Sequence, residues 1–160
     1  MTNGLQRGFT LIEMLVTVAI LAIILGIGVP SLQPLIERYR ISAASNRLFT
    51  ALTTARSEAI RRGQDVTLSR TGVSWAGGWR IAAGDATLRF ENALPRGVAI
   101  SEANDIASVV FGVSGRLSSP ATQHAVFKIC FADSTVNARE IAISEIGHVQ
   151  SRVASDTGCN

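Results

Sequence analysis

Hydrophobic and polar positions divide the chain into three regions with different patterns. Residues 14–29 form an apolar run without a single charged side chain. Residues 30–63 instead repeat apolar positions at spacings of three and four, and the residues after them form short alternating runs separated by turns. The pattern predicts an apolar helix, an amphipathic helix and a β-rich region. Together these define an α+β protein.

The apolar run is long enough to cross a membrane as a helix. Counted from Phe9 to Val29, the helix would rise about 31 Å, which matches the hydrocarbon core of a bilayer. An ordinary secretory signal is the alternative, because Gly26 and Gly28 resemble the small residues of a cleavage site. That alternative is disfavoured, since the cut would fall just before Val29 and a carboxylate, Glu13, lies inside the apolar block.

Glu13 needs a physical explanation, because an ionised carboxylate in the middle of a bilayer costs about 2.5–3.5 kcal/mol or more. If the chain is cut after Gly8, a new α-amino group appears on Phe9, one helical turn from Glu13. That ammonium group, in the same subunit or in a neighbouring one, would compensate the carboxylate. The alternative is a protonated glutamate at the membrane interface with no further role.

The residues around Glu13 resemble a known processing signal. Residues 7–15 read Arg-Gly-Phe-Thr-Leu-Ile-Glu-Met-Leu. They resemble the leader and processing site of type IV pilins and type II secretion pseudopilins. The resemblance implies a leader of residues 1–8, cleavage between Gly8 and Phe9 by prepilin peptidase, N-methylation of Phe9 and docking onto a filament through Glu13. It also implies a single pass through the bacterial inner membrane with a periplasmic head, followed by incorporation into a pilus or pseudopilus.

The second region predicts an amphipathic helix that follows a local disturbance. Pro30 and Pro34 lack backbone donors and two glycines precede them, so a kink is expected within residues 26–34. The helix should end at Gly63, after a basic last turn. A coiled coil is disfavoured because sustained heptads are absent. The predicted apolar stripe consists of Leu35, Ile36, Tyr39, Ala43, Ala44, Leu48, Leu52, Ala55, Ala59 and Ile60.

The remainder, residues 64–160, predicts a β-rich head. Glycine-containing turns separate the apolar runs, which suggests an antiparallel β-sandwich or a pair of small sheets over the helix. Residues 118–123 are expected to form a flexible loop. The predicted strands cover residues 65–70, 78–83, 87–91, 98–101, 108–112, 125–131, 139–144 and 148–153.

Trp75 and Trp79 flank a Gly-Gly turn in this head. They would form an exposed partner-binding surface in one interpretation and cover the end of the core in the other. The second interpretation is favoured, because large aromatic side chains near a turn usually bury their rings.

Several segments of the head narrow the resemblance to the GspH/FimT group. These are residues 55–62, 78–79, 109–111, 129–130 and 139–149. The resemblance implies a pilin-like fold and a structural role as a minor type IV pilin near a pilus tip, supporting assembly, twitching motility or DNA uptake. A minor pseudopilin of a type II secretion machine and a DNA-binding receptor pilin are the alternatives. The implied partners are other pilins, prepilin peptidase, the inner membrane and DNA.

Cys130 and Cys159 are the two cysteines, and an even count behind an export-type N-terminus predicts a disulfide. Closing a loop of about 29 residues would contribute roughly 3–4 kcal/mol of stability. Two unrelated thiols are the alternative. His124 and His148 stand alone in the sequence, so the spacing predicts no metal site, and no cofactor is expected.

The net charge and the absence of catalytic motifs narrow the classes of function. The formal net charge is +3, and Lys128 is the only lysine. This mild positive charge falls short of a dedicated nucleic-acid-binding surface. The sequence has no Gly-x-Ser-x-Gly motif and no phosphate-binding Gly-x-x-x-x-Gly-Lys loop, so no catalytic residue is expected.

DNA binding depends on the C-terminal part of the chain. The family resemblance implies a Gly-Arg-x-Arg segment, but this chain has Gly-His-Val-Gln at residues 147–150. Arg152 is the expected substitute, helped by Arg139, Arg116 and His148 if the strands bring them together. The alternative is that these cations form a solvated edge that discourages strand pairing.

Overall fold

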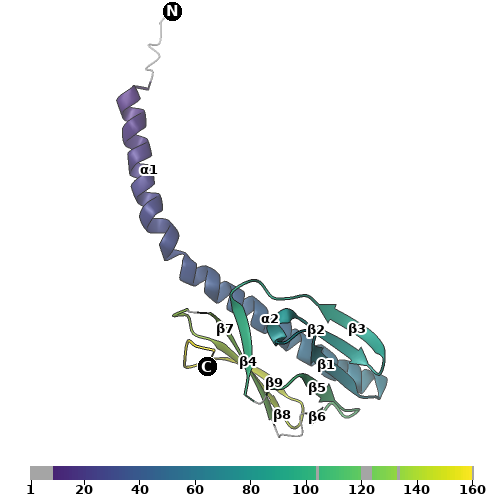
Figure 1. The fold of residues 1–160 in the computed structure, drawn as a ribbon. Coiled ribbons are helices and arrows are strands. Elements are labelled where there is room, and N and C mark those ends of the chain that lie inside the picture. Colours follow the sequence, from purple (N-terminus) through teal and green to yellow (C-terminus); the bar gives the residue numbers. More distant parts are fainter. Residues whose placement is uncertain (1–8, 104, 120–123, 133, 160) are drawn as a thin grey trace, which may run out of the picture. The chain divides into compact units, whose positions relative to one another are not determined.

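The computed structural model describes residues 9–103, 105–119, 124–132 and 134–159, without the side chains of residues 27–31. The chain divides into two compact units, Met1–Leu35 and Ile36–Asn160. The first contains helix α1 (Leu11–Ser31), and the second contains most of helix α2 (Gln33–Arg62) and every strand (Figure 1).

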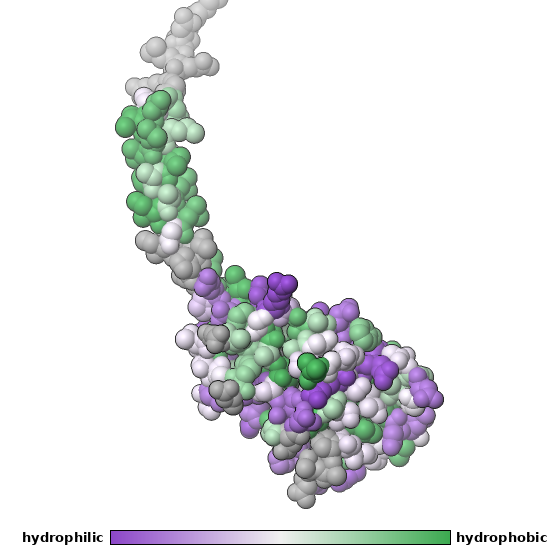
Figure 2. Space-filling model, in the orientation of Figure 1, coloured by the Kyte–Doolittle hydropathy of each residue, from purple (hydrophilic) through white to green (hydrophobic). Residues whose placement is uncertain are grey.

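Helix α1 exposes its apolar side chains on its visible surface (Figure 2). Its large apolar residues range from 49% exposed at Val16 to 79% exposed at Leu11. Among the residues that the structure describes, no helix combines the length and the apolar character needed to cross a membrane.

The predicted disturbance between the helices is an interruption at Leu32. Helix α1 ends at Ser31 and α2 begins at Gln33, and the Leu35 N–H donates to the Leu32 carbonyl at 3.1 Å. Pro34 lies in the first turn of α2, where its missing donor is tolerated. The disturbance expected within residues 26–34 is therefore present as a break between the two helices.

Helix α2 buries one face, and the predicted stripe is right in its middle and wrong at its ends. Tyr39 is 76% exposed and Ile60 is 53% exposed. The strands cover the helix between these positions, whereas spacing alone does not reveal how far a covering sheet extends. The helix ends as predicted at Gly63, with φ +62° and an N–H bond to the Ala59 carbonyl. The buried positions are Ile41, Ala44, Ser45, Leu48, Ala51, Leu52, Ala55 and Ala59.

Two antiparallel sheets form the head, in agreement with the prediction of an antiparallel β-sandwich or a pair of small sheets. The five-stranded sheet has the order β3-β2-β1-β5-β6, and the four-stranded sheet has the order β4-β7-β8-β9. The first contains β1 (Val66–Arg70), β2 (Trp79–Ala83), β3 (Ala86–Glu91), β5 (Ser108–Phe111) and β6 (Leu117–Ser119). The second contains β4 (Val98–Glu102), β7 (His124–Phe131), β8 (Arg139–Ser144) and β9 (Val149–Val153).

All eight predicted strands are present, and β6 was missed. The prediction of a loop over residues 118–123 is wrong for Ser118 and Ser119, which belong to β6, and its remaining positions lie outside the described residues. Strand β6 is a three-residue edge strand whose pairs are Val110 with Ser119 and Phe111 with Leu117. A strand of three residues is too short to show an alternating pattern, so it is recognised only by its pairing with β5.

One hydrophobic core joins α2 to both sheets. Trp75, in a short 3-10 helix (Trp75–Gly77), is fully buried, and Trp79 is 2% exposed. The indole N–H of Trp75 donates to the Ile106 carbonyl at 2.6 Å, and its ring meets Phe127 edge-on at 5.0 Å. Both tryptophans therefore belong to the core, which confirms the favoured interpretation.

Candidate assembly segment and binding surfaces

The described part of the processing site begins at Phe9, which is 76% exposed and lies two residues before α1. Gly8, on the other side of the predicted cut, lies outside the described residues. The structure therefore provides the setting of Phe9, but cleavage and methylation remain predictions.

Thr10 caps the N-terminus of helix α1, a role that was not predicted from the sequence. Its hydroxyl oxygen accepts a hydrogen bond from the Glu13 N–H at 3.3 Å, and its carbonyl accepts one from Met14. Thr-x-x-Glu before an apolar run is the capping-box pattern, which was the available sequence signal. The threonine of the processing motif thus satisfies a backbone donor at the helix start.

Glu13 lies in the first turn of α1 and is exposed. A negative charge at that position interacts favourably with the N-terminal end of the helix dipole. Within the described residues, Glu13 has no ion-pair partner. Its predicted partner, the amino group of a processed Phe9, would arise only after cleavage.

Arg56 connects α2 to two hairpin turns that lie far apart in the sequence. Its Nε donates to the Gly115 carbonyl at 3.0 Å, and its Nη2 donates to the Ile146 carbonyl at 3.1 Å. The turns also touch directly, because a side chain at Gly147 would collide with the Gly115 carbonyl oxygen. Arg56 therefore holds both sheets at one end of the helix. The family resemblance of residues 55–62 is the one signal in the sequence that points to Arg56.

Glu58 binds the two arginines that end α2. Its carboxylate lies 2.6 Å from Nη2 of Arg61 and 2.6 Å from Nε of Arg62. Hydrogen bonds from Arg61 and then Arg62 lower the pKa of Glu58. The basic last turn is therefore partly neutralised within the helix.

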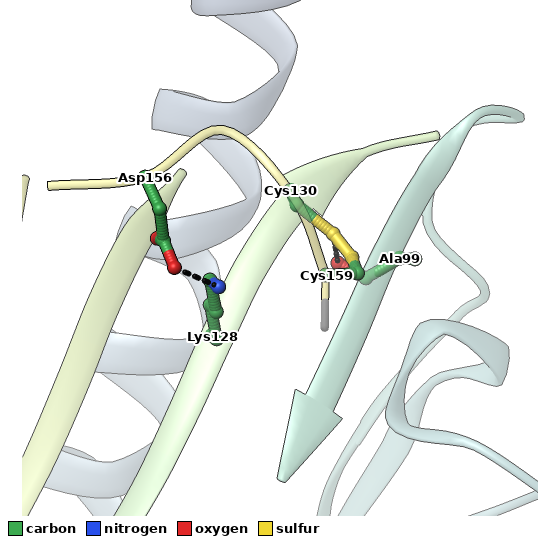
Figure 3. The surroundings of a disulfide bond; sticks show 5 residues. All are labelled: Ala99, Lys128, Cys130, Asp156 and Cys159. Carbon is green, nitrogen blue, oxygen red and sulfur yellow. Dashed lines mark hydrogen bonds and ion pairs between the residues drawn. A yellow bond between two sulfur atoms is a disulfide. The ribbon is translucent and has the colours of Figure 1, made fainter. Parts of the chain in front are cut away.

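The predicted disulfide between Cys130 and Cys159 is present (Figure 3), with the two Cα atoms 5.6 Å apart. Cys130 is on β7 and is fully buried in a small cluster with Ala138 and Ala154. An ion pair from Lys128 Nζ to Asp156 Oδ2, 2.7 Å long, fixes the same tail. The C-terminal segment is therefore held against the four-stranded sheet by covalent and ionic contacts.

The residues expected to contact DNA do not form one surface. Arg152 and Glu140 pair across β8 and β9, and the guanidinium binds the carboxylate with contacts of 3.1 and 2.8 Å. Arg139 is the neighbour of Glu140, so its side chain points to the opposite face of the sheet. The condition that the strands bring Arg139 beside Arg152 is therefore not met.

The other two candidates lie in turns. Arg116 is exposed in the β5–β6 turn, and His148 is exposed where the β8–β9 turn enters β9. Nδ1 of His148 lies 3.1 Å from Nε2 of Gln150. The contact between Gly115 and Gly147 brings these two turns together, away from the ion pair of Arg152 with Glu140.

The fold and the N-terminal segment together define a pilin-like filament subunit. A family model described as "Type II transport protein GspH" matches residues 44–147, and one described as "Prokaryotic N-terminal methylation motif" matches residues 4–29. The chain belongs to the GspH family. Members of this family are structural subunits of pili or pseudopili that assemble with other pilins or pseudopilins, and they are not enzymes.

Two kinds of curated relative share part of the sequence. The pilin-like protein PilA1 of Thermus thermophilus is 43% identical over 63 residues, which are 39% of each chain. A fimbrial protein of Pseudomonas aeruginosa is 38% identical over 66 residues, 41% of this chain and 42% of the relative. The chain therefore matches about two fifths of the length of these relatives.

Solved structures share the fold over most of the chain. The type IV minor pilin FimU of Pseudomonas aeruginosa has a TM-score of 0.66 at 24% identity and covers 78% of this chain and 98% of its own. The minor pseudopilin EpsH of the Vibrio cholerae type 2 secretion system has a TM-score of 0.55 at 14% identity, over 73% of this chain and 99% of its own. Both similarities concern the fold alone.

Proposed function

We propose that this chain is a minor type IV pilin that assembles at or near the pilus tip and supports pilus assembly, twitching motility or DNA uptake. The observation that carries the proposal is the closer structural similarity to the minor pilin FimU than to the pseudopilin EpsH. The pilin-like and fimbrial names of the curated relatives agree with it.

The processing steps form part of the same proposal. Cleavage between Gly8 and Phe9 would create an α-amino group close to Glu13, and methylation would follow on that group. Before assembly, the apolar residues 9–29 would hold the subunit in the inner membrane with its head in the periplasm. Mass spectrometry of the membrane-extracted protein should show a chain that starts at Phe9 with one added methyl group. An intact Met1 in a peptidase-competent cell would refute this step.

Deletion and tagging in the native cell test the pilus assignment. Val73 is 96% exposed in the loop after β1, so a short epitope inserted there should leave the core intact. Deletion should abolish surface pili or twitching without affecting secretion of a type II substrate. Immunogold labelling of complemented cells should place the epitope at filament ends. Labelling spread evenly along the pili would contradict the tip position.

A minor pseudopilin is the second candidate, favoured by the description of the matching family and by the shared fold of EpsH. It predicts the reverse result of the deletion, in which pili persist and secretion fails. The same strain therefore distinguishes the two assignments in one experiment.

Direct DNA contact remains a prediction with a weaker structural basis, because Glu140 already binds Arg152. A gel shift with duplex DNA at two salt concentrations tests it, since phosphate contacts are lost as salt rises. Binding that disappears in Arg152→Ala would support the contact, and no binding at low salt would eliminate it.

A further inference from the structure

A groove of about 380 Å³ lies between the beginning of α2 and the end of the four-stranded sheet. Buried Ile41 and Val136 form part of its wall together with Val153, which is 58% exposed although it is apolar. Arg38 and Arg139 are also lining residues, one from α2 and the other from β8. The groove therefore combines an aliphatic surface with two cationic side chains.

The two arginines of this groove differ from Arg152 on the adjacent strand in having no described partner. Within the described residues, neither guanidinium forms an ion pair or a side-chain hydrogen bond. Glu37, the carboxylate next to Arg38 in the sequence, accepts a 2.5 Å hydrogen bond from the Ser134 hydroxyl. By contrast, Arg152 on the adjacent strand is held by Glu140. Among the described residues, no carboxylate compensates the positive charge of the groove, which favours a carboxylate-bearing occupant.

A turn at the opposite end of α2 carries a carboxylate beside an apolar side chain, although Arg116 and His148 lie in the same pair of turns. The β8–β9 turn contains exposed Glu145, without an ion pair in the described part of the chain, next to Ile146, which is 57% exposed. Arg56 fixes this turn to the helix through the Ile146 carbonyl. From Arg38 to Arg56 the helix rises about 27 Å. The acidic, aliphatic turn and the cationic, aliphatic groove therefore lie at different ends of the head.

Subunits that repeat along a filament meet through heterologous contacts, in which one end of a subunit faces the other end of its neighbour. We propose that the groove of Arg38 and Arg139 binds an acidic turn of the adjacent filament subunit, with a glutamate beside an aliphatic residue as at Glu145 and Ile146. The carboxylate pairs with the two guanidiniums, and the aliphatic side chain covers Val153. This proposal rests on the proposed function, because it requires a neighbouring subunit of the same fold.

A peptide titration tests the chemistry of the groove. The head, residues 36–160, contains the buried core that joins both sheets to α2 and forms one compact unit, so it is suited to NMR as an isolated domain. The probe is a cyclised peptide that contains residues 144–148. Signals of Val136, Asn137 and Val153 should shift with the peptide, and Arg139→Gln should weaken binding about tenfold. Raising the salt concentration should weaken binding as well.

Two controls make the titration specific. Arg80→Gln removes an exposed arginine without a described ion pair from β2, outside the groove, and should leave binding unchanged. A peptide with glutamine in place of Glu145 should not bind. Equal binding of this peptide would overturn the proposal, and so would groove signals that shift with a duplex DNA but not with the acidic peptide.

Full-length protein separates this proposal from the function on which it rests. The double variant Arg38→Gln, Arg139→Gln should be processed at Phe9 like the wild type but recovered about tenfold less in sheared filaments. Equal recovery of variant and wild type would overturn the docking site alone. Absence of the wild-type chain from every filament would overturn the proposed function instead.

Discussion

Helices α1 and α2 follow each other in the chain and differ in where their apolar side chains find partners. Leu21 and Ile23 of α1 are 55% and 64% exposed, whereas Leu48 and Leu52 of α2 are fully buried under the sheets. An exposed apolar helix surface gains free energy only when something outside it, lipid or another helix, covers it. The comparison therefore assigns α2 to the stability of the head, and it predicts that α1 serves interactions with lipid or with other subunits.

Glu13→Ala in α1 is expected to have the largest effect, on assembly and not on the head. Without the carboxylate, the compensating pair with a processed Phe9 is lost, and recovery in sheared filaments should fall by more than about tenfold. Thr17→Ala is the matched control, because within the described residues the Thr17 hydroxyl donates to the Met14 carbonyl of its own helix and binds no other group. Normal incorporation of Glu13→Ala would remove the proposed reason for a carboxylate in this segment.

A pair of leucine truncations tests the comparison directly. Leu52→Ala should lower the free energy of unfolding of the head by about 2–5 kcal/mol, because it leaves a cavity in the core. Leu21→Ala should leave that value nearly unchanged. Denaturant unfolding of the full-length chain in detergent can be followed by the fluorescence of the buried Trp75 and Trp79, which report on the head. Similar losses for both variants would show that α1 also stabilises the head.

Arg56→Met should cost less, about 1.5–3 kcal/mol, because the Gly115 and Ile146 carbonyls lose a charged donor. Arg61→Met is the control, since Arg61 is well exposed and binds only Glu58 in the described structure. It should leave the unfolding free energy nearly unchanged, because exposed ion pairs contribute little to stability. Equal effects would mean that the two turns do not depend on Arg56.

The smallest effects concern two carboxyl groups of the head. Burial raises the pKa of Glu102 although Arg70 is close, so the stability linked to its proton is present at low pH and declines as pH rises through the folded pKa. A hydrogen bond from Lys128 lowers the pKa of Asp156, so its contribution is present at neutral pH and is lost as pH falls through the folded pKa. Carboxyl NMR titration should give midpoints shifted in these opposite directions, and Lys128→Met should raise that of Asp156.

Local sequence patterns predicted most strands of the head but not the contacts between segments that are distant in the sequence. Short runs bounded by turn residues marked eight strands, and Gly63 marked the end of α2, because both signals come from residues close in the sequence. Strand β6 and the contacts of Arg56 were missed. They depend on which segment lies beside which, and residues 56 and 146 are brought together only by the fold.

The sequence by itself determined the two helices and the disulfide cysteines of this GspH-family subunit, and it predicts the N-terminal processing and assembly segment. The helices and the disulfide depend on short-range chemistry: an apolar run, a glycine stop and an even cysteine count. Only the tertiary structure decided which arginines of the four-stranded sheet bind a carboxylate and which face the groove. Strand register pairs Arg152 with Glu140 on one face of the sheet and directs Arg139 to the other, into a groove with Arg38. A change of register by one residue would reverse those faces, and the register is set by the burial of one face in the core and by the turn that joins β8 to β9.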